Sequence, residues 1–117
     1  MQDNTGHSFS AYFKRAVSPL MVLALLRNRK MYGYEISQEI NHRTKKKLSI
    51  AVLYPVLYRL EEQGYIQIVD TVIENGRARN YYTATDAGEA YLNQSYGEFL
   101  ELSQQFCEIV EGDPYEK

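Results

Sequence analysis

The chain has 117 residues, of which 44% are hydrophobic and 24% are charged, a size and composition that suit one globular domain with one core. Its single cysteine, Cys107, excludes an internal disulfide and any zinc site built from several cysteines. Residues 1–85 hold 12 lysines and arginines against 7 acidic residues, whereas residues 86–117 hold 1 against 8, so the net charge of −2 conceals a basic body that suits an anionic partner.

The N-terminal sequence has neither the pattern of an export signal nor that of a membrane span. Its first residues lack the basic-then-apolar order of a signal peptide, and the longest apolar run, Leu20 to Leu26, is too short to cross a bilayer. We therefore expect a cytoplasmic protein with no membrane partner.

Two helical segments are expected before the first basic cluster. Apolar and aromatic residues recur at helical spacing from Phe9 to Val17, which predicts a short amphipathic helix. Ser18 and Pro19 then match an N-cap and a first helical position, which predicts that a new helix starts there. The apolar run that follows is typical of a helix buried in a small core.

Counting from the helix that starts at Ser18, a second helix is expected from about Tyr34 to His42, with Ile36 and Ile40 one turn apart on its inner face. A basic loop at residues 43–47 follows and leads into a third helix. Three helices joined in this way, with a short glycine-containing link, resemble a helix-turn-helix arrangement.

The stretch from Leu48 to Ile66 predicts the third helix and the turn that ends it. Three leucines recur at spacings of four and three on one face, whereas Tyr54 and Tyr58 fall on the other side. Gly64 ends the pattern as a C-terminal cap would. An aromatic outer face next to a run of lysines suits a helix that lies against something anionic.

The start of this third helix has two interpretations. Ser49 is a plausible N-cap, because its hydroxyl can accept from a backbone N–H of the first turn. Pro55 would then lie beyond the first turn and remove a helical hydrogen bond. The alternative is that the regular helix begins nearer Ala51 or Val52.

Residues 65–84 predict a β-hairpin, because they are rich in isoleucine, valine, threonine and tyrosine around Asn75-Gly76. Asn-Gly favours a two-residue type I′ turn, which would place Glu74 opposite Arg77. The strand faces do not alternate cleanly, so the rest of the register stays open.

A last helix of about 25 residues is expected after Thr85, a good N-cap, and it would extend for about 35 Å. Such a helix is too long to bury its apolar stripe on a core of this size, so we expect the stripe to pack against a second copy of the chain. The expected dimerisation residues approximate heptad spacing and are Leu92, Phe99, Leu102, Phe106 and Ile109.

The order of these elements predicts a mostly α fold with a small β-hairpin, namely a winged helix-turn-helix with a C-terminal dimerisation helix. The expected divisions are a winged-helix DNA-binding domain with its N-terminal helix at residues 1–85, the dimerisation helix at 86–112 and a tail at 113–117.

Several short motifs carry a resemblance to a known family. They are YGYEI at residues 32–36, LYP at 53–55, LEEQGYI at 60–66, GR with RNYY at 76–82, and TDAG at 85–88. In this order they resemble the PadR family of bacterial transcriptional regulators, over about residues 16–105. The resemblance implies a homodimer that binds operator DNA and usually represses. It also implies that some members sense small aromatic or cationic compounds at the dimer interface, often with a tryptophan in the last helix that this chain lacks.

The residues expected to contact double-stranded DNA are cationic or aromatic and lie in the basic loop, the third helix and the hairpin tip. They are Tyr34, Lys45, Lys46, Lys47, Ser49, Tyr54, Tyr58, Arg77 and Arg79. Each has an alternative interpretation. The lysines suit any solvated loop, the two arginines can balance Glu74, and Tyr34 and Tyr54 can belong to the core.

An effector pocket for a small aromatic compound is a further hypothesis, because the chain has eleven tyrosines and more rings near its two ends than a small core needs. The candidate residues are Phe9, Tyr12, Phe13, Tyr91, Tyr96 and Phe99. In the alternative interpretation, these rings simply fill the dimer core.

No pattern in the sequence predicts catalysis, a metal site or a cofactor. His7 and His42 are far apart without a carboxylate motif near either, and neither a nucleophile elbow nor a phosphate loop occurs. The expected function is sequence-specific DNA binding as a homodimer, with repression of transcription from a pseudo-palindromic operator. The alternative is a winged-helix protein-interaction module without DNA binding, and salt dependence distinguishes the two.

Overall fold

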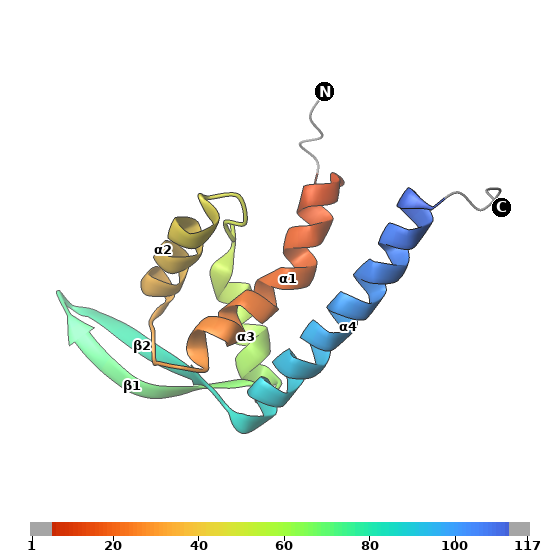
Figure 1. Cartoon of the computed structure of the whole chain (residues 1–117). Helices are drawn as coiled ribbons and strands as arrows, with labels where there is room; N and C mark the ends of the chain where they lie inside the picture. Colours follow the sequence, from red (N-terminus) through yellow and green to blue (C-terminus); the bar gives the residue numbers. More distant parts are fainter. Residues whose placement is uncertain (1–5, 113–117) are drawn as a thin grey trace.

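A computed structural model of the chain describes residues 6–112, so the expected tail at 113–117 lies outside the described residues. The described part folds in the order α1 (Phe9–Leu26), α2 (Gly33–Thr44), α3 (Leu53–Glu62), β1 (Ile66–Glu74), β2 (Arg77–Ala84) and α4 (Asp86–Glu111). The molecule is elongated, with extents of 66 × 36 × 23 Å, because the hairpin projects from one side of the helices and α4 from the other (Figure 1). The predicted fold class, a mostly helical winged helix-turn-helix, is confirmed.

The core lies where the second half of α1 meets α2, α3 and the base of the hairpin. All three leucines of the α3 stripe are buried in it, as predicted, and Ile36 and Ile40 enter it from α2. Burying an aliphatic side chain stabilises a fold by about 1.5–3 kcal/mol, so this cluster holds the three helices together. Its members are Val22, Leu23, Leu26, Met31, Ile36, Ile40, Leu53, Val56, Leu57, Leu60, Ile66, Tyr82 and Leu92.

The N-terminal region is one helix, so the prediction of a new helix starting at Ser18-Pro19 is wrong. The N-cap is Ser8, whose Oγ accepts from the N–H of Ala11 at 3.2 Å, and Pro19 lies inside α1. Ser18 is buried, and its hydroxyl donates back to the Lys14 carbonyl at 2.5 Å. Proline removes one helical hydrogen bond and bends a helix without ending it when packing holds both halves, and α1 bends along its length (Figure 1).

By length and composition alone, α1 is long and apolar enough to cross a membrane. A core helix of a globular protein passes the same test, and the second half of α1 is part of the core. Val22, Leu23 and Leu26 are fully enclosed by the other helices and the hairpin base.

The start of α3 agrees with the second interpretation of its sequence. The N-cap is Val52 and the helix begins at Leu53, so Ser49 is not the cap. Pro55 is the third helical residue and falls in the first turn, where a backbone N–H has no partner within the helix. Gly64, with φ of +80°, follows the end of α3 in the left-handed conformation that favours glycine.

The hairpin turn is the predicted two-residue type, since Asn75 and Gly76 have φ of +52° and +75° and Glu74 pairs with Arg77. The register shifts between Ile68 and Asp70, where one extra residue makes a bulge. This bulge explains why the faces of the strand do not alternate cleanly in the sequence.

Candidate nucleic-acid interface

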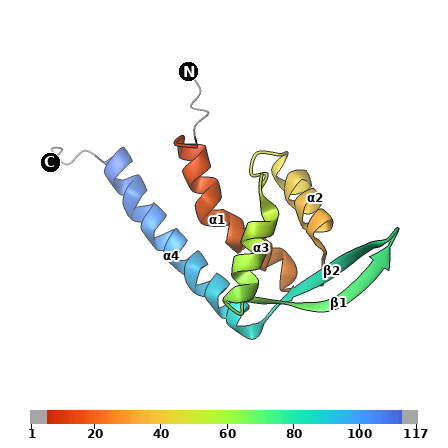
Figure 2. The same ribbon diagram turned by 180° about the vertical axis from the view of Figure 1, so that it is seen from behind.

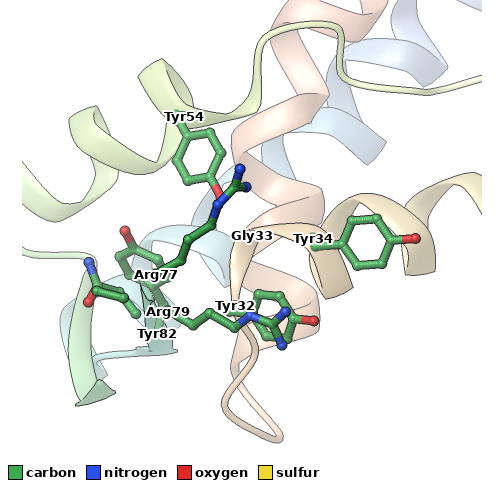
Figure 3. Close-up of a pocket in the computed structure, with 9 residues that line it drawn as sticks. Tyr32, Gly33, Tyr34, Tyr54, Arg77, Arg79 and Tyr82 are labelled. Carbon is green, nitrogen blue, oxygen red and sulfur yellow. The ribbon is translucent and has the colours of Figure 1, made fainter. Parts of the chain in front are cut away.

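A groove of about 480 Å³ lies between the first turn of α2, the outer face of α3 and the outer half of β2 (Figure 3). Its lining is aromatic and cationic. The residues that line it are Tyr32, Gly33, Tyr34, Tyr54, Arg77, Ala78, Arg79, Asn80 and Tyr82. Four of the sequence-predicted residues, Tyr34, Tyr54, Arg77 and Arg79, are thus brought together.

The groove contains the N-terminus of α2, which begins after the N-cap residue Tyr32. Tyr32 donates its backbone N–H to Glu35 Oε1 at 3.2 Å and accepts at its carbonyl from Ile36 at 3.1 Å. The N–H groups of a first helical turn have no partner within the helix, and the helix dipole is positive at this end. This end of the groove therefore suits an anion such as a phosphate.

Two tyrosines line the groove, but only the Tyr54 hydroxyl points into it, because the Tyr34 ring points away and its hydroxyl accepts from the Gln38 amide at 2.8 Å (Figure 3). Tyr34 on α2 and Tyr54 on α3 are 60% and 63% exposed, so neither belongs to the core. The Tyr54 ring lies against Gly33, where a Cβ atom would overlap its hydroxyl. Glycine at this position therefore lets the start of α2 approach α3 closely enough to shape the groove.

The hairpin of β1 and β2 is called the wing below. Its two arginines, Arg77 and Arg79, have different surroundings. Arg79 forms an ion pair with Glu74, and its guanidinium lies 4.8 Å from the centroid of the Tyr32 ring. Arg77 is exposed and extends toward the Tyr54 hydroxyl (Figure 3). The interpretation in which an arginine balances Glu74 thus applies to Arg79, which ties the wing to the start of α2.

The basic loop lies at the other end of α3 from the wing base, and its three lysines are exposed. Lys45 and Lys46 adopt left-handed backbone conformations, with φ of +52° and +65°. Thr44 Oγ1 accepts from the Leu48 N–H at 3.1 Å, and Ser49 Oγ donates to Asn41 Oδ1 at 2.6 Å. Ser49 therefore closes the loop onto α2, a tertiary role that its sequence context did not suggest.

Several groove residues were not predicted from the sequence, and Tyr32, Asn80 and Tyr82 are examples. Tyr32 and Gly33 stand in the YGYEI motif and the other two in RNYY, so the motifs marked them without giving their role. Tyr58 is 64% exposed on the same outer face of α3, one turn beyond Tyr54, but does not line the groove.

Asp70 and Tyr82, two ionisable residues of the wing, take part in its attachment to the helices. The Lys30 ammonium lies 2.9 Å from Asp70 Oδ2, and its hydrogen bond and charge lower the pKa of Asp70. Burial raises the pKa of Tyr82, and the neighbouring Glu61 carboxylate adds to that effect. Met31 also pairs with Tyr82 through two backbone hydrogen bonds of 2.9 and 3.1 Å, so the segment before α2 is fixed to β2.

The residues of the expected dimerisation stripe differ in burial along α4. Leu92 is 6% exposed and belongs to the core of its own protomer, whereas Phe99 is 39% exposed and Phe106 is 61% exposed. Leu102 and Ile109 are exposed as well. The outer part of α4 therefore presents a large apolar surface that stays exposed within residues 6–112.

The expected effector residues fall into three groups. Rings from α1 and α4 meet at Phe13 and Phe99, whose centroids are 6.3 Å apart, with Phe9 6.0 Å from Phe13 and Tyr96 6.5 Å from Phe99. Tyr12 instead contacts His7 and Arg15. Tyr91 stacks on Tyr65 at the other end of α4, with centroids 4.6 Å apart, so it is separate from the Phe13–Phe99 contact.

A three-helix core, a wing of two strands and a cationic, aromatic groove between them define a winged helix-turn-helix protein, the class that reads DNA with a helix in the major groove. Residues 22–94 match the model of the transcriptional regulator PadR-like family. The chain belongs to this PadR-like family of transcriptional regulators, which implies DNA binding and is not a family of enzymes.

Similar proteins agree with this assignment. The chain is 34% identical over 93 residues to the transcriptional regulator Rv3488 of Mycobacterium tuberculosis, covering 80% of this chain and 85% of that one. Its structure is similar to that of a PadR family regulator from Eggerthella lenta, with a TM-score of 0.78, 25% identity and coverage of 87% and 88%. It is also similar to smu.1704 from Streptococcus mutans, with a TM-score of 0.68, 35% identity and coverage of 87% and 93%.

Proposed function

We propose that this protein is a homodimeric repressor that binds a pseudo-palindromic operator in a sequence-specific way. The observation that carries the proposal is the exposed groove in which the α2 N-terminus, Tyr54 and Arg77 converge and which Tyr34 borders. Hydroxyls, arginines and helix N-termini are the groups that proteins use to hold DNA phosphates.

In the proposed complex, α3 is the recognition helix and enters the major groove with Tyr54 and Tyr58 toward the DNA. The phosphate backbone lies along the groove, where Tyr34 and Arg77 contact it, and residues 45–47, which precede the N-terminus of α3, contact further phosphates. These phosphate contacts fix the position of the helix, and base edges near its exposed face supply the sequence preference.

The proposed dimer forms through the outer part of α4. Phe99 and Phe106 are a heptad apart on its exposed apolar surface, and an exposed patch of this kind marks a protein contact. A two-fold axis would then place two recognition helices on half-sites about 34–36 Å apart, which is one turn of DNA. In this arrangement residues 1–85 serve DNA binding and residues 86–112 serve dimerisation.

The proposed effect on transcription is repression, because a dimer held on an operator near a promoter blocks access to it. The protein would act in the cytoplasm, where the chromosome of a bacterium lies. A small planar aromatic compound is the proposed effector, and the proposal is supported by the exposed rings of Phe9, Tyr96 and Phe99, which would line a slot between the arms of two copies. Binding of planar dyes to the dimer tests this part, and no dye binding below about 100 μM would contradict it.

The test of DNA binding is a titration with the DNA upstream of the protein's own coding region, at low and moderate salt. Binding to an inverted repeat there should weaken with a slope of about −0.9 in log affinity per phosphate contact. Lys46→Ala with Lys47→Ala should weaken binding to all sequences alike and reduce the slope by about one per lost contact. The matched control is Lys46→Arg with Lys47→Arg, which keeps both charges.

Binding that does not depend on salt, or an absence of binding to any DNA, would contradict the proposal. It would favour the alternative of a winged-helix module for protein interaction. Unchanged affinity of the double alanine variant would remove the basic loop from the interface while leaving the groove to be tested.

A further inference from the structure

The proposed dimerisation helix α4 is buried against the rest of its protomer in its first two turns. Within α4, Gly88 and Leu92 are the buried residues. From there to Glu111 the helix runs free of the hairpin and of α3, and it diverges from α1 toward its end (Figures 1 and 2). The direction of this arm therefore depends on how its base is held.

The base of α4 is held by the short turn that connects α3 to β1. The Thr85 hydroxyl donates to the Gly64 carbonyl at 2.7 Å, and the Thr85 N–H donates to the Tyr65 carbonyl at 3.0 Å. The same hydroxyl accepts from the Gly88 N–H at 3.0 Å and so caps α4. One side chain thus fixes the start of α4 to the turn after the recognition helix.

Two further contacts orient the helix on this turn. A Cβ atom at Gly88 would overlap the carbonyl oxygen of Tyr65, so α4 approaches the turn as closely as a glycine allows. The rings of Tyr65 and Tyr91 stack with an angle of 13° between their planes. We call the contact of Gly64 and Tyr65 with Thr85, Gly88 and Tyr91 the clamp.

We propose that the clamp sets the angle between the recognition helix and the dimerisation arm, and thereby the spacing between operator half-sites that the dimer accepts. This inference rests on the proposed function. Thr85, Gly88 and Tyr91 are then positioning residues, since they act through α3 and do not contact DNA.

The dimensions make the effect of a small change large. From Leu92 to the end of α4 the arm is about 28 Å long, so a tilt of about 10° at the clamp moves its end by about 5 Å. Successive base pairs are about 3.4 Å apart along DNA, so such a tilt corresponds to more than one base pair of spacing.

The second support of the arm is of a different kind. Phe13 on α1 and Phe99 on α4 meet edge to face, and their contact is apolar and without hydrogen bonds of the rings. Such a contact tolerates sliding, whereas the clamp consists of hydrogen bonds to backbone carbonyls and a backbone approach at Gly88. The clamp is therefore the element that defines the angle.

The test compares variants of the full chain that change the clamp with variants that do not. Gly88→Ala inserts a methyl group against the Tyr65 carbonyl, and Tyr91→Ala removes the stacked ring without adding an atom. Tyr91→Phe keeps the stack and should restore the wild-type behaviour. Gly97→Ala is the matched control, because a Cβ there meets nothing within 4 Å and Gly97 lies opposite the apolar stripe of α4.

The first readout is the affinity for DNA in which two half-sites, selected from random sequence by the wild-type protein, are separated by spacers of increasing length. The second readout needs no DNA. It is the distance between spin labels at His42→Cys in the two protomers, in a Cys107→Ser background. Sedimentation establishes that each variant is dimeric.

We expect the preferred spacer of Gly88→Ala and Tyr91→Ala to move by at least about one base pair, with a matching change in the label distance. Loss of affinity with an unchanged spacer preference and label distance would overturn the inference, because a merely structural defect has that result. If Gly88→Ala does not fold, Tyr91→Ala carries the test. If the wild-type dimer binds no DNA, the proposed function fails, while the label distance still decides whether the clamp sets the angle.

Discussion

Individual side chains in the groove take different roles despite similar chemistry. Arg77 and Arg79 are two positions apart on β2, yet Glu74 and the Tyr32 ring hold Arg79 while Arg77 extends into the groove. A charge that is already paired adds little to phosphate binding, because its partner must be released first. The phosphate contact of the wing is therefore expected at Arg77.

Arg77→Ala should weaken DNA binding and reduce the salt slope by about one, with little change in melting temperature, because an exposed turn residue adds little to stability. Arg79→Ala should lower the melting temperature more and the salt slope less, since it frees the wing from Tyr32. Affinity at two salt concentrations and thermal melts measure both effects. A large fall in melting temperature for Arg77→Ala would show that its role is structural.

Gly33→Ala should weaken DNA binding by displacing the Tyr54 ring from the groove. The helix itself should tolerate the change, because alanine is favoured over glycine in helices by up to about 1 kcal/mol. The effect should disappear in a Tyr54→Ala background, since two substitutions that act through the same side chain are not additive. Equal losses in both backgrounds would mean that Gly33 acts independently of Tyr54.

At the scale of elements, the wing is attached to the helices by contacts on the segment that precedes α2. Met31 pairs with Tyr82 on β2, and Lys30 pairs with Asp70 on β1. The Lys30 ammonium also lies 5.5 Å from the centroid of the Tyr81 ring. These contacts therefore hold the base of the hairpin against the helices.

The Lys30–Asp70 pair predicts a pH dependence of stability. Because the pKa of Asp70 is lowered from its ordinary value of 3.8 in the folded protein, its contribution is present above that value and is lost as the pH falls through the folded pKa. Asp70→Asn should therefore lower the melting temperature slightly at neutral pH, and the difference from wild type should vanish in acid. Melts of both proteins from pH 7 to pH 2.5 measure this. A difference that stays constant over this range would exclude the ion pair as its cause.

At the scale of the whole molecule, local sequence signals predicted the elements and missed the contacts between them. Asn75-Gly76 defined the hairpin turn because its backbone needs are local, whereas the bulge after Ile68 has no marker in the sequence. Ser18-Pro19 has the pattern of a helix start, but α1 stays continuous, because Phe13 packs against Phe99 of α4 before the proline and Val22, Leu23 and Leu26 are buried in the core after it. The groove depends on the approach of Gly33 to Tyr54, which is tertiary and becomes visible only when α2 and α3 are packed.

The apolar surface of α4 makes the oligomeric state the property of the whole molecule that is most open to test. Phe106 is 61% exposed in the single chain, and burying a phenylalanine side chain contributes about 1.5–3 kcal/mol. A charge in its place, as in Phe106→Asp, should therefore yield monomers or aggregates in sedimentation. Gln104→Asp is the matched control, because Gln104 lies on the face of α4 opposite the stripe and the substitution adds the same charge. A normal dimer of Phe106→Asp would mean that α4 does not pair through this stripe, and the two recognition helices would then need another contact to reach their half-sites together.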